Sequence, residues 1–240
     1  MKTAQLKFIK RIFHAPKSTP NALTLLETGT TPIDFEIHKR QLNFLHHILS
    51  QDNNDPVKVV YYEQLKYPEE PNWANEVKTL RTKYQLKQTD NEIINLSKDK
   101  WKGIVKENVR TAALDYLKTE AAKLKQGEKL IGQYDKLETQ KYILTLNPDK
   151  ARKLFHIRTG IIDVKTVRKY KYGEDKTCRL CLLGEENVEH IVNDCISIPR
   201  TSVINNVFTS DIHEMELIAE RCVTFTTLAK EIEEQNVGSC

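Results

Sequence analysis

Apolar residues recur at intervals of three and four along most of the chain, the spacing of one face of an α-helix. The pattern predicts a first helix that ends at Ala15-Pro16, because the residue before a proline avoids helical geometry. A second helix is expected to start with Thr19 as its N-cap and Pro20 in its first turn. Further helices are predicted from about residue 32 and over 56–67, 72–85, 90–96 and 97–124, with another that opens at Asn147-Pro148.

Residues 137–146 fit either a short strand or a helix, and they are the one ambiguous segment of this pattern. Nowhere does the chain alternate strands with helices in the manner of a parallel sheet. Eight glycines and eight prolines are also few for a β-sandwich with many turns. The sequence therefore predicts an all-α fold, with an irregular multi-helix body and a small C-terminal module.

Several function classes are excluded by what the sequence lacks. No apolar run approaches the 18 residues of a membrane span, and the first residues lack the apolar stretch of a signal peptide. Glycine-rich phosphate loops and the signatures of serine hydrolases and zinc proteases are missing too. We therefore expect an intracellular protein, nuclear or cytoplasmic, with no membrane partner and no small-molecule substrate.

The clearest chemical signal is a C-x2-C-x8-H-x4-C array near the C-terminus. Its members are Cys178, Cys181, His190 and Cys195. A two-residue gap lets one tight turn direct two thiolates to the same point, and Zn2+ favours a tetrahedron of sulfur and imidazole ligands. Four protein ligands leave no position for water, so the predicted cofactor is one structural Zn2+. Cys222, Cys240 and His213 are expected to take no part, and Cys222 should lie in the core.

The net charge of +4 conceals a division along the chain. Residues 177–240 carry four basic and eleven acidic side chains, a net charge of −7, whereas residues 1–176 carry +11. A basic body favours a partner with phosphate groups, although a solvated lysine-rich surface explains the same composition. The acidic residues would repel phosphates, so removal of the residues after Ser197 is expected to tighten nucleic-acid binding.

Residues 141–176 lead directly into the array and carry a net charge of +6. Cations alternate there with aromatic rings, which suits single-stranded nucleic acid because cations follow the backbone and rings stack on bases. The alternative is an ordinary charged linker between a helix and the metal module. The candidate contacts are Lys165, Arg168, Lys169, Tyr170, Lys171 and Tyr172.

Three stretches together resemble the C-terminal region of non-LTR (LINE/jockey-type) retrotransposon reverse transcriptases, downstream of the polymerase palm. They are residues 6–49, which begin LKFIKRIFHAPKSTP, residues 101–117, WKGIVKENVRTAALDYL, and residues 154–165, LFHIRTGIIDVK, followed by the array. The resemblance implies thumb-side helices and a zinc knuckle that contacts template RNA or target DNA. It carries over only the four metal ligands, because the catalytic aspartates of that family lie upstream. The eight-residue gap exceeds the four-residue gap of viral nucleocapsid knuckles, which puts a packaging role in doubt.

These observations predict four segments: a helical body (1–135), a basic connecting segment (136–176), a zinc knuckle (177–198) and an acidic helical tail (199–240). The predicted function is that of a nucleic-acid-binding fragment of an RNA-directed DNA polymerase, not catalytic on its own. Its partner would be RNA or DNA, single-stranded or as a template–primer. The alternative is a zinc-stapled helical adaptor that binds other proteins and not nucleic acid.

Overall fold

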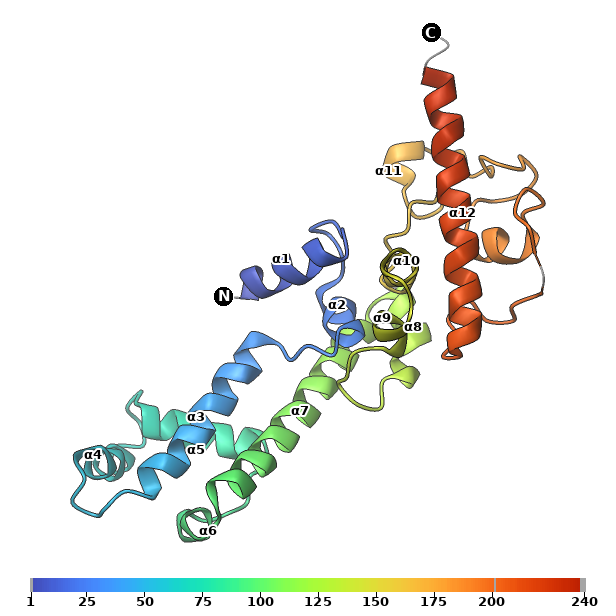
Figure 1. The fold of residues 1–240 in the computed structure, drawn as a ribbon. Helices are drawn as coiled ribbons and strands as arrows, with labels where there is room; N and C mark the ends of the chain where they lie inside the picture. The colour runs from blue at the N-terminus through green and yellow to red at the C-terminus, as the bar shows by residue number, and fades with distance from the viewer. Residues whose placement is uncertain (1, 201, 238–240) are drawn as a thin grey trace. The chain divides into compact units, whose positions relative to one another are not determined.

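The computed structural model describes residues 2–200 and 202–237, which form an all-α fold as the sequence predicts (Figure 1). Extended pairing within this part of the chain is limited to two isolated bridges, and no sheet forms there. None of the described helices combines the length and apolarity needed to cross a membrane. The helices are α1 (Lys2–Ile12), α2 (Asn21–Glu27), α3 (Ile33–Leu49), α4 (Pro56–Leu65), α5 (Trp73–Lys83), α6 (Asp90–Asn95), α7 (Lys98–Ala122), α8 (Lys125–Leu130), η1 (Ile131–Gln133), α9 (Lys141–Thr145), α10 (Pro148–Arg158), α11 (Lys169–Tyr172), η2 (His190–Asp194) and α12 (Ile212–Val237).

The chain forms two compact units. Residues 1–2 and 31–116 belong to the first unit, and residues 3–30 and 117–240 belong to the second. The long helix α7 begins in the first unit and ends in the second. The cysteine–histidine array and the basic segment both lie in the second unit, so the candidate site is a property of that unit alone.

The first unit is built around α3, which packs against α4, α5 and α6. Leu42, Leu45 and Leu49 on its inner face are fully buried. The indole of Trp101 is buried as well, and its Nε1–H donates to the Leu42 carbonyl at 2.9 Å. Leu42 thus satisfies the one polar atom of the largest side chain in this core.

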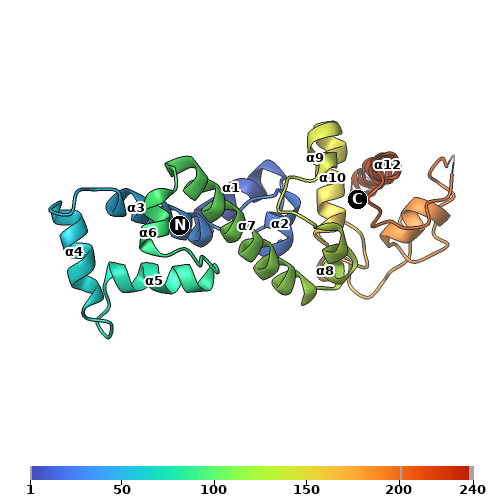
Figure 2. The same cartoon turned by 90° about the horizontal axis from the view of Figure 1, so that it is seen from below.

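The second unit is centred on the packing of α10 against α12, which lie side by side in Figures 1 and 2, with α9 in contact with both. Phe155 on α10 and Phe225 on α12 are fully buried, and so is Cys222, as predicted. Helix α12 is therefore a core element of the second unit. Removal of the residues after Ser197 would also expose the α10 core, so the tighter binding expected from that truncation stays a prediction.

A buried ion pair joins α2 to α10. The carboxylate of Glu27 accepts from Nε of Arg158 at 2.8 and 2.9 Å, and neither side chain is more than 2% exposed. The hydroxyls of Tyr134 and Tyr142 also donate to this carboxylate. Burial and the charge of Glu27 raise the pKa of both tyrosines well above the ordinary value, so they remain donors. The Glu27 carboxylate is therefore buried and accepts hydrogen bonds from three side chains.

The structure corrects the predicted start of α2 and decides between helix and strand for the ambiguous segment. Thr19 does not cap α2, because its hydroxyl donates to the Pro16 carbonyl at 2.7 Å and the helix begins at Asn21. Residues 141–145 of the ambiguous segment form the short helix α9. Tyr142 decides that outcome, since the helical turn buries its ring and brings its hydroxyl within 2.8 Å of the Glu27 carboxylate.

Candidate metal centre and basic segment

The four residues of the cysteine–histidine array converge on one point. Their ligand atoms all lie within 4.8 Å of one another. Sγ of Cys178 is 3.9 Å from Sγ of Cys195, and Sγ of Cys181 is 3.2 Å from Nε2 of His190. Thiolates bound to one tetrahedral ion at about 2.3 Å would lie about 3.8 Å apart. The geometry therefore confirms that these residues can hold a single metal ion.

A tight turn and a short return loop bring the ligands together. The backbone N–H of Leu182 donates to the Cys178 carbonyl at 3.0 Å, and the N–H of Cys178 donates to the Gly184 carbonyl at 2.7 Å. A Cβ atom at Gly184 would lie 2.8 Å from Nδ1 of His190, closer than real Cβ contacts come. Glycine is therefore required where the loop passes over the imidazole at the start of η2.

The thiols of this site differ in their electrostatic surroundings. Burial raises the pKa of Cys178, and it raises that of Cys195 to about 12. Burial acts in the same direction on Cys181, but the backbone amides of Leu183 and Gly184 and the neighbouring thiols outweigh it and lower the pKa. A cysteine binds a metal ion as a thiolate. Metal binding by these cysteines therefore has to release protons, and it must weaken as the pH falls.

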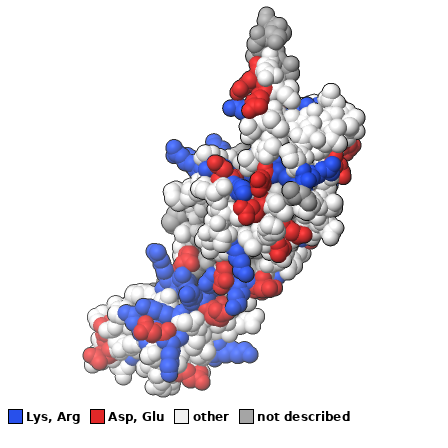
Figure 3. Space-filling view, turned by 45° about the vertical axis from the view of Figure 1, so that its right-hand side comes forward, with Lys and Arg blue, Asp and Glu red and all other residues white. Residues whose placement is uncertain are grey.

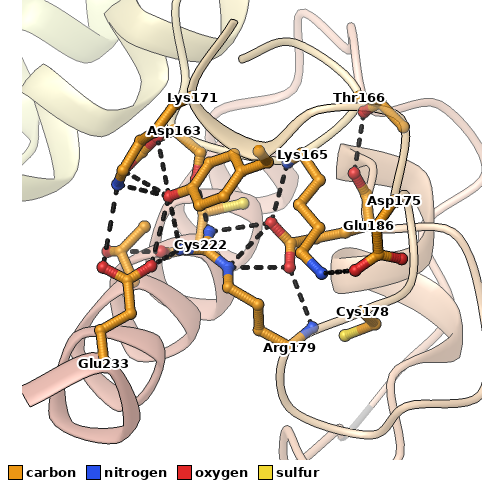
Figure 4. A network of polar contacts seen from close by, with 12 residues as sticks. Asp163, Lys165, Thr166, Lys171, Asp175, Cys178, Arg179, Glu186, Cys222 and Glu233 are labelled. Atoms are coloured by element: carbon orange, nitrogen blue, oxygen red, sulfur yellow. Dashed lines mark hydrogen bonds and ion pairs between the residues drawn. The ribbon is translucent and has the colours of Figure 1, made fainter. Parts of the chain in front are cut away.

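Arg179, between the first two ligands, ties the metal centre to the rest of the unit (Figure 4). Its guanidinium donates to the fully buried carboxylate of Glu186 at 2.8 and 2.9 Å, and it also contacts the Glu233 carboxylate on α12 at 2.5 Å. Glu186 in turn accepts from the backbone N–H of Lys165 at 2.9 Å. One arginine–glutamate pair thus joins the metal loop, the basic segment and α12.

Three of the six candidate nucleic-acid contacts lie beside an aspartate or beside Arg179. The ammonium of Lys165 lies 2.5 Å from Asp175 and lowers the pKa of that carboxyl to about 2. Lys171 lies 3.1 Å from Asp163, and the hydroxyl of Tyr172 accepts from Arg179 at 2.6 Å. These contacts tie the three side chains to neighbouring parts of the second unit, and Figure 4 shows those of Lys165 and Lys171.

The other three candidates lie on α11 or at its start. Tyr170 is 81% exposed, and Lys169 is exposed as well. Arg168 is half-buried, with one amino group 2.6 Å from the Ile161 carbonyl and the other 2.7 Å from the Tyr170 hydroxyl. The structure brings Arg168 and Tyr170 together at the surface of the second unit.

Sequence reasoning did not identify the partners of this segment. Arg179 and Glu186 had one available signal, since both lie between metal ligands in the array. No sequence signal pointed to Asp163 or Glu233 as partners. Glu233 lies 54 residues from Arg179, the arginine that it contacts. On the face shown in Figure 3, acidic side chains are interspersed with basic ones.

We expect Arg179→Lys to weaken the attachment of the metal loop. Lysine keeps the charge but cannot form the forked contact with Glu186, and a hydrogen bond to a charged group contributes about 1.5–3 kcal/mol. Urea unfolding of the metal-loaded protein should show a loss of this size. Lys176→Ala is the control, because Lys176 forms an exposed pair with Glu185 at 3.5 Å and should contribute less than about 1 kcal/mol. Equal losses of unfolding free energy in the two variants would show that the Arg179 contacts stabilise the protein no more than an exposed ion pair does.

The fold and the site together define a helical protein in which three cysteines and one histidine lie close enough to hold one metal ion, on a loop that contacts the long helix α12. Comparisons with protein-family models, with curated proteins and with solved structures found no match to this chain. The function proposed below therefore rests on the chemistry of the residues.

Proposed function

We propose that this protein is a zinc-containing nucleic-acid-binding module with a structural role for the metal. Three thiolates and one imidazole are a donor set that zinc favours, and four protein ligands leave no coordination position for a reacting water. The module would bind single-stranded RNA or DNA, or a template–primer, and would not catalyse nucleotidyl transfer by itself. The carbonyl, amide and ion-pair contacts of Arg179 would keep the zinc loop fixed against the basic segment.

The observation that carries this proposal is an exposed tyrosine in a cationic segment that the metal loop holds in place. The ring of Tyr170 is 81% exposed, with the guanidinium of Arg168 5.8 Å from its centre. The hydroxyl of Thr166, four residues before Tyr170, donates to the Glu186 carbonyl at 2.8 Å, which fixes this part of the basic segment on the metal loop. A segment that is ordered beforehand loses less conformational entropy on binding. An exposed ring beside cations is the arrangement that binds unpaired bases.

Tyr170→Ala is expected to weaken binding of a mixed-sequence single-stranded oligonucleotide by about 1–3 kcal/mol, because a stacked base loses its platform. The dependence of log K on log salt concentration should keep its slope, since no charge is removed. Titrations by fluorescence anisotropy at several salt concentrations measure both quantities.

Tyr67→Ala is the matched control, because Tyr67 is also exposed, at 56%, but belongs to the first unit and not to the basic segment. It should leave affinity unchanged. If the wild-type protein shows no salt-dependent binding to RNA or DNA, the proposal fails. If Tyr67→Ala and Tyr170→Ala behave alike, stacking by Tyr170 is ruled out.

The proposal includes an origin in the thumb-side region of a non-LTR retrotransposon reverse transcriptase. Two of the stretches that carry this resemblance, residues 6–49 and 154–165, contribute the two halves of the buried Glu27–Arg158 pair. Their contact supports the view that these stretches and the array act as one unit. Polymerase-palm motifs in an adjacent reading frame of the same gene would test this origin directly.

A protein-interaction adaptor is the second candidate function. Leu182 and Leu183, at the tip of the metal loop, are 72% and 74% exposed, and apolar side chains of this size at a loop tip suit a protein partner. Under this alternative the zinc only stabilises the loop. Absence of salt-dependent nucleic-acid binding, with retention of zinc, would favour the adaptor.

A further inference from the structure

A pocket of 610 Å³ opens in the second unit beside Tyr170. Its walls come from the loop after α1, from α10, from residues 161–171 that follow α10, and from α12. Residues far apart in the sequence therefore form the pocket. The charged and aromatic side chains that line it include His14, Lys153, Asp163, Arg168, Tyr170 and Lys171. Pockets of this size accommodate a nucleotide-sized ligand.

The wall formed by the loop after α1 is held firmly against α10. Nε2–H of His156 donates to the Phe13 carbonyl at 2.7 Å, and the rings of Phe13 and Phe155 stack with their centres 4.1 Å apart. Burial lowers the pKa of His156 to about 4, so the imidazole is neutral near pH 7 and leaves the positive charge of the pocket to lysine and arginine. These contacts order this wall of the pocket before a ligand arrives.

Lys153 is a cation of this lining whose hydrogen-bond partner is neutral. Its amine donates to the Thr226 hydroxyl at 3.0 Å, and within the part of the chain that the structure describes no carboxylate lies within 4 Å of it. Burial lowers the pKa of Lys153. A partly buried amine with a neutral hydrogen-bond partner gains from an anion at contact distance, because no carboxylate forms an ion pair with it and the negative charge of Asp163 acts only from farther away.

The single carboxylate of the lining does not oppose an anion strongly. Asp163 lies 3.1 Å from the ammonium of Lys171, which neutralises it locally. Arg168 is held in place by the Ile161 carbonyl at 2.6 Å and by the Tyr170 hydroxyl at 2.7 Å. Lys153 and Arg168 therefore remain to give the pocket its positive character, with the exposed ring of Tyr170 lining the same pocket.

We infer that this pocket binds one phosphate group of a nucleic-acid strand, held by Lys153 and Arg168, while the adjoining base stacks on Tyr170. The inference rests on the proposed function and adds the place where the strand is held. Phosphate suits the site because the two cations are fixed and charge-assisted hydrogen bonds to phosphate are among the strongest that proteins make. An aromatic ring beside the phosphate position selects a nucleotide over a bare anion.

Lys153→Met tests the inference, because methionine fills nearly the same volume without the charge. We expect it to weaken binding of a single-stranded oligonucleotide about tenfold or more at fixed salt. Lys141→Met is the matched control: it removes the same charge from an exposed position on α9 outside the pocket and should change affinity by less than about twofold. Arg168→Gln should resemble Lys153→Met, which provides a second variant if the first fails to fold by circular dichroism.

The outcomes separate this inference from the proposed function. If the wild-type protein binds the oligonucleotide and both lysine variants lose affinity equally, the pocket is overturned while nucleic-acid binding stands. Inorganic phosphate and a nucleoside 5′-monophosphate are titrated in parallel to distinguish a free anion from a strand. If these bind in a Lys153-dependent manner but no strand binds, the proposed function and the strand assignment both fail and only an anion pocket remains.

Discussion

Removal of zinc is expected to unfold residues 177–198 and to loosen their contact with α12, while the first unit keeps its helices. A loop of about 20 residues cannot bury enough apolar surface to fold alone, and metal binding supplies on the order of 10 kcal/mol. Arg221 on α12 donates to the Val192 carbonyl at 2.6 Å, so disorder of the metal loop also removes a partner of that helix. Elemental analysis should find one zinc per chain, and hydrogen exchange after chelation should locate the unfolding.

Cys195→Ala and Cys222→Ala form a matched pair for this prediction. Both cysteines are buried, but only Cys195 belongs to the array. Cys195→Ala should abolish stoichiometric zinc binding, whereas Cys222→Ala should retain it. Acidification should release the metal from the wild-type protein, because protons compete for the thiolates. Protein prepared without chelators that contains no zinc would refute the prediction, as would loss of all helical signal on chelation.

Glu27→Gln is expected to destabilise the second unit by about 3–5 kcal/mol, because it leaves the buried guanidinium of Arg158 without its counter-charge. Burial by itself would lower the pKa of Arg158, but the Glu27 carboxylate reverses this and raises it, so the arginine stays charged in the native state. The fully buried position gives that charge no access to water. Urea unfolding followed by circular dichroism measures the loss.

Glu120→Gln serves as the control, since Glu120 on α7 forms an exposed pair with Lys123 and should contribute less than about 1 kcal/mol. Arg158→Met should be as damaging as Glu27→Gln. The double variant, Glu27→Gln with Arg158→Met, should recover part of the loss, because no buried charge then remains. Full additivity of the two single losses would contradict a direct buried pair.

The metal ligands could be identified from sequence because their geometry is local. A two-residue gap and a return loop of eight residues place Cys178, Cys181 and His190 on adjoining turns, whatever the rest of the chain does. The main helices were predictable for a similar reason. Helical periodicity depends on neighbours three and four residues away, so the apolar face of α3 was evident from residues 33–49 alone.

The basic segment shows that a local sequence pattern does not predict the partners of its charged side chains. Lys165, Lys171 and Tyr172 have the composition of a nucleic-acid contact, yet Asp175, Asp163 and the Arg179 network bind them. A charged side chain in a sequence gives no indication of whether its partner is solvent, a ligand or a carboxylate brought near by folding. The same holds for the pocket beside Tyr170, whose Lys153 and His14 are 139 residues apart.

The sequence by itself determined that this protein is helical and that three cysteines and one histidine can gather around one metal ion, because both properties arise from contacts between near neighbours. Only the tertiary structure decided which basic residues the acidic residues meet. Glu27 meets Arg158 across 131 residues, and Glu233 on α12 meets Arg179 across 54. Pairings at such separations depend on how α2, α10 and α12 pack, and packing is set by the shape of the whole unit rather than by any one segment.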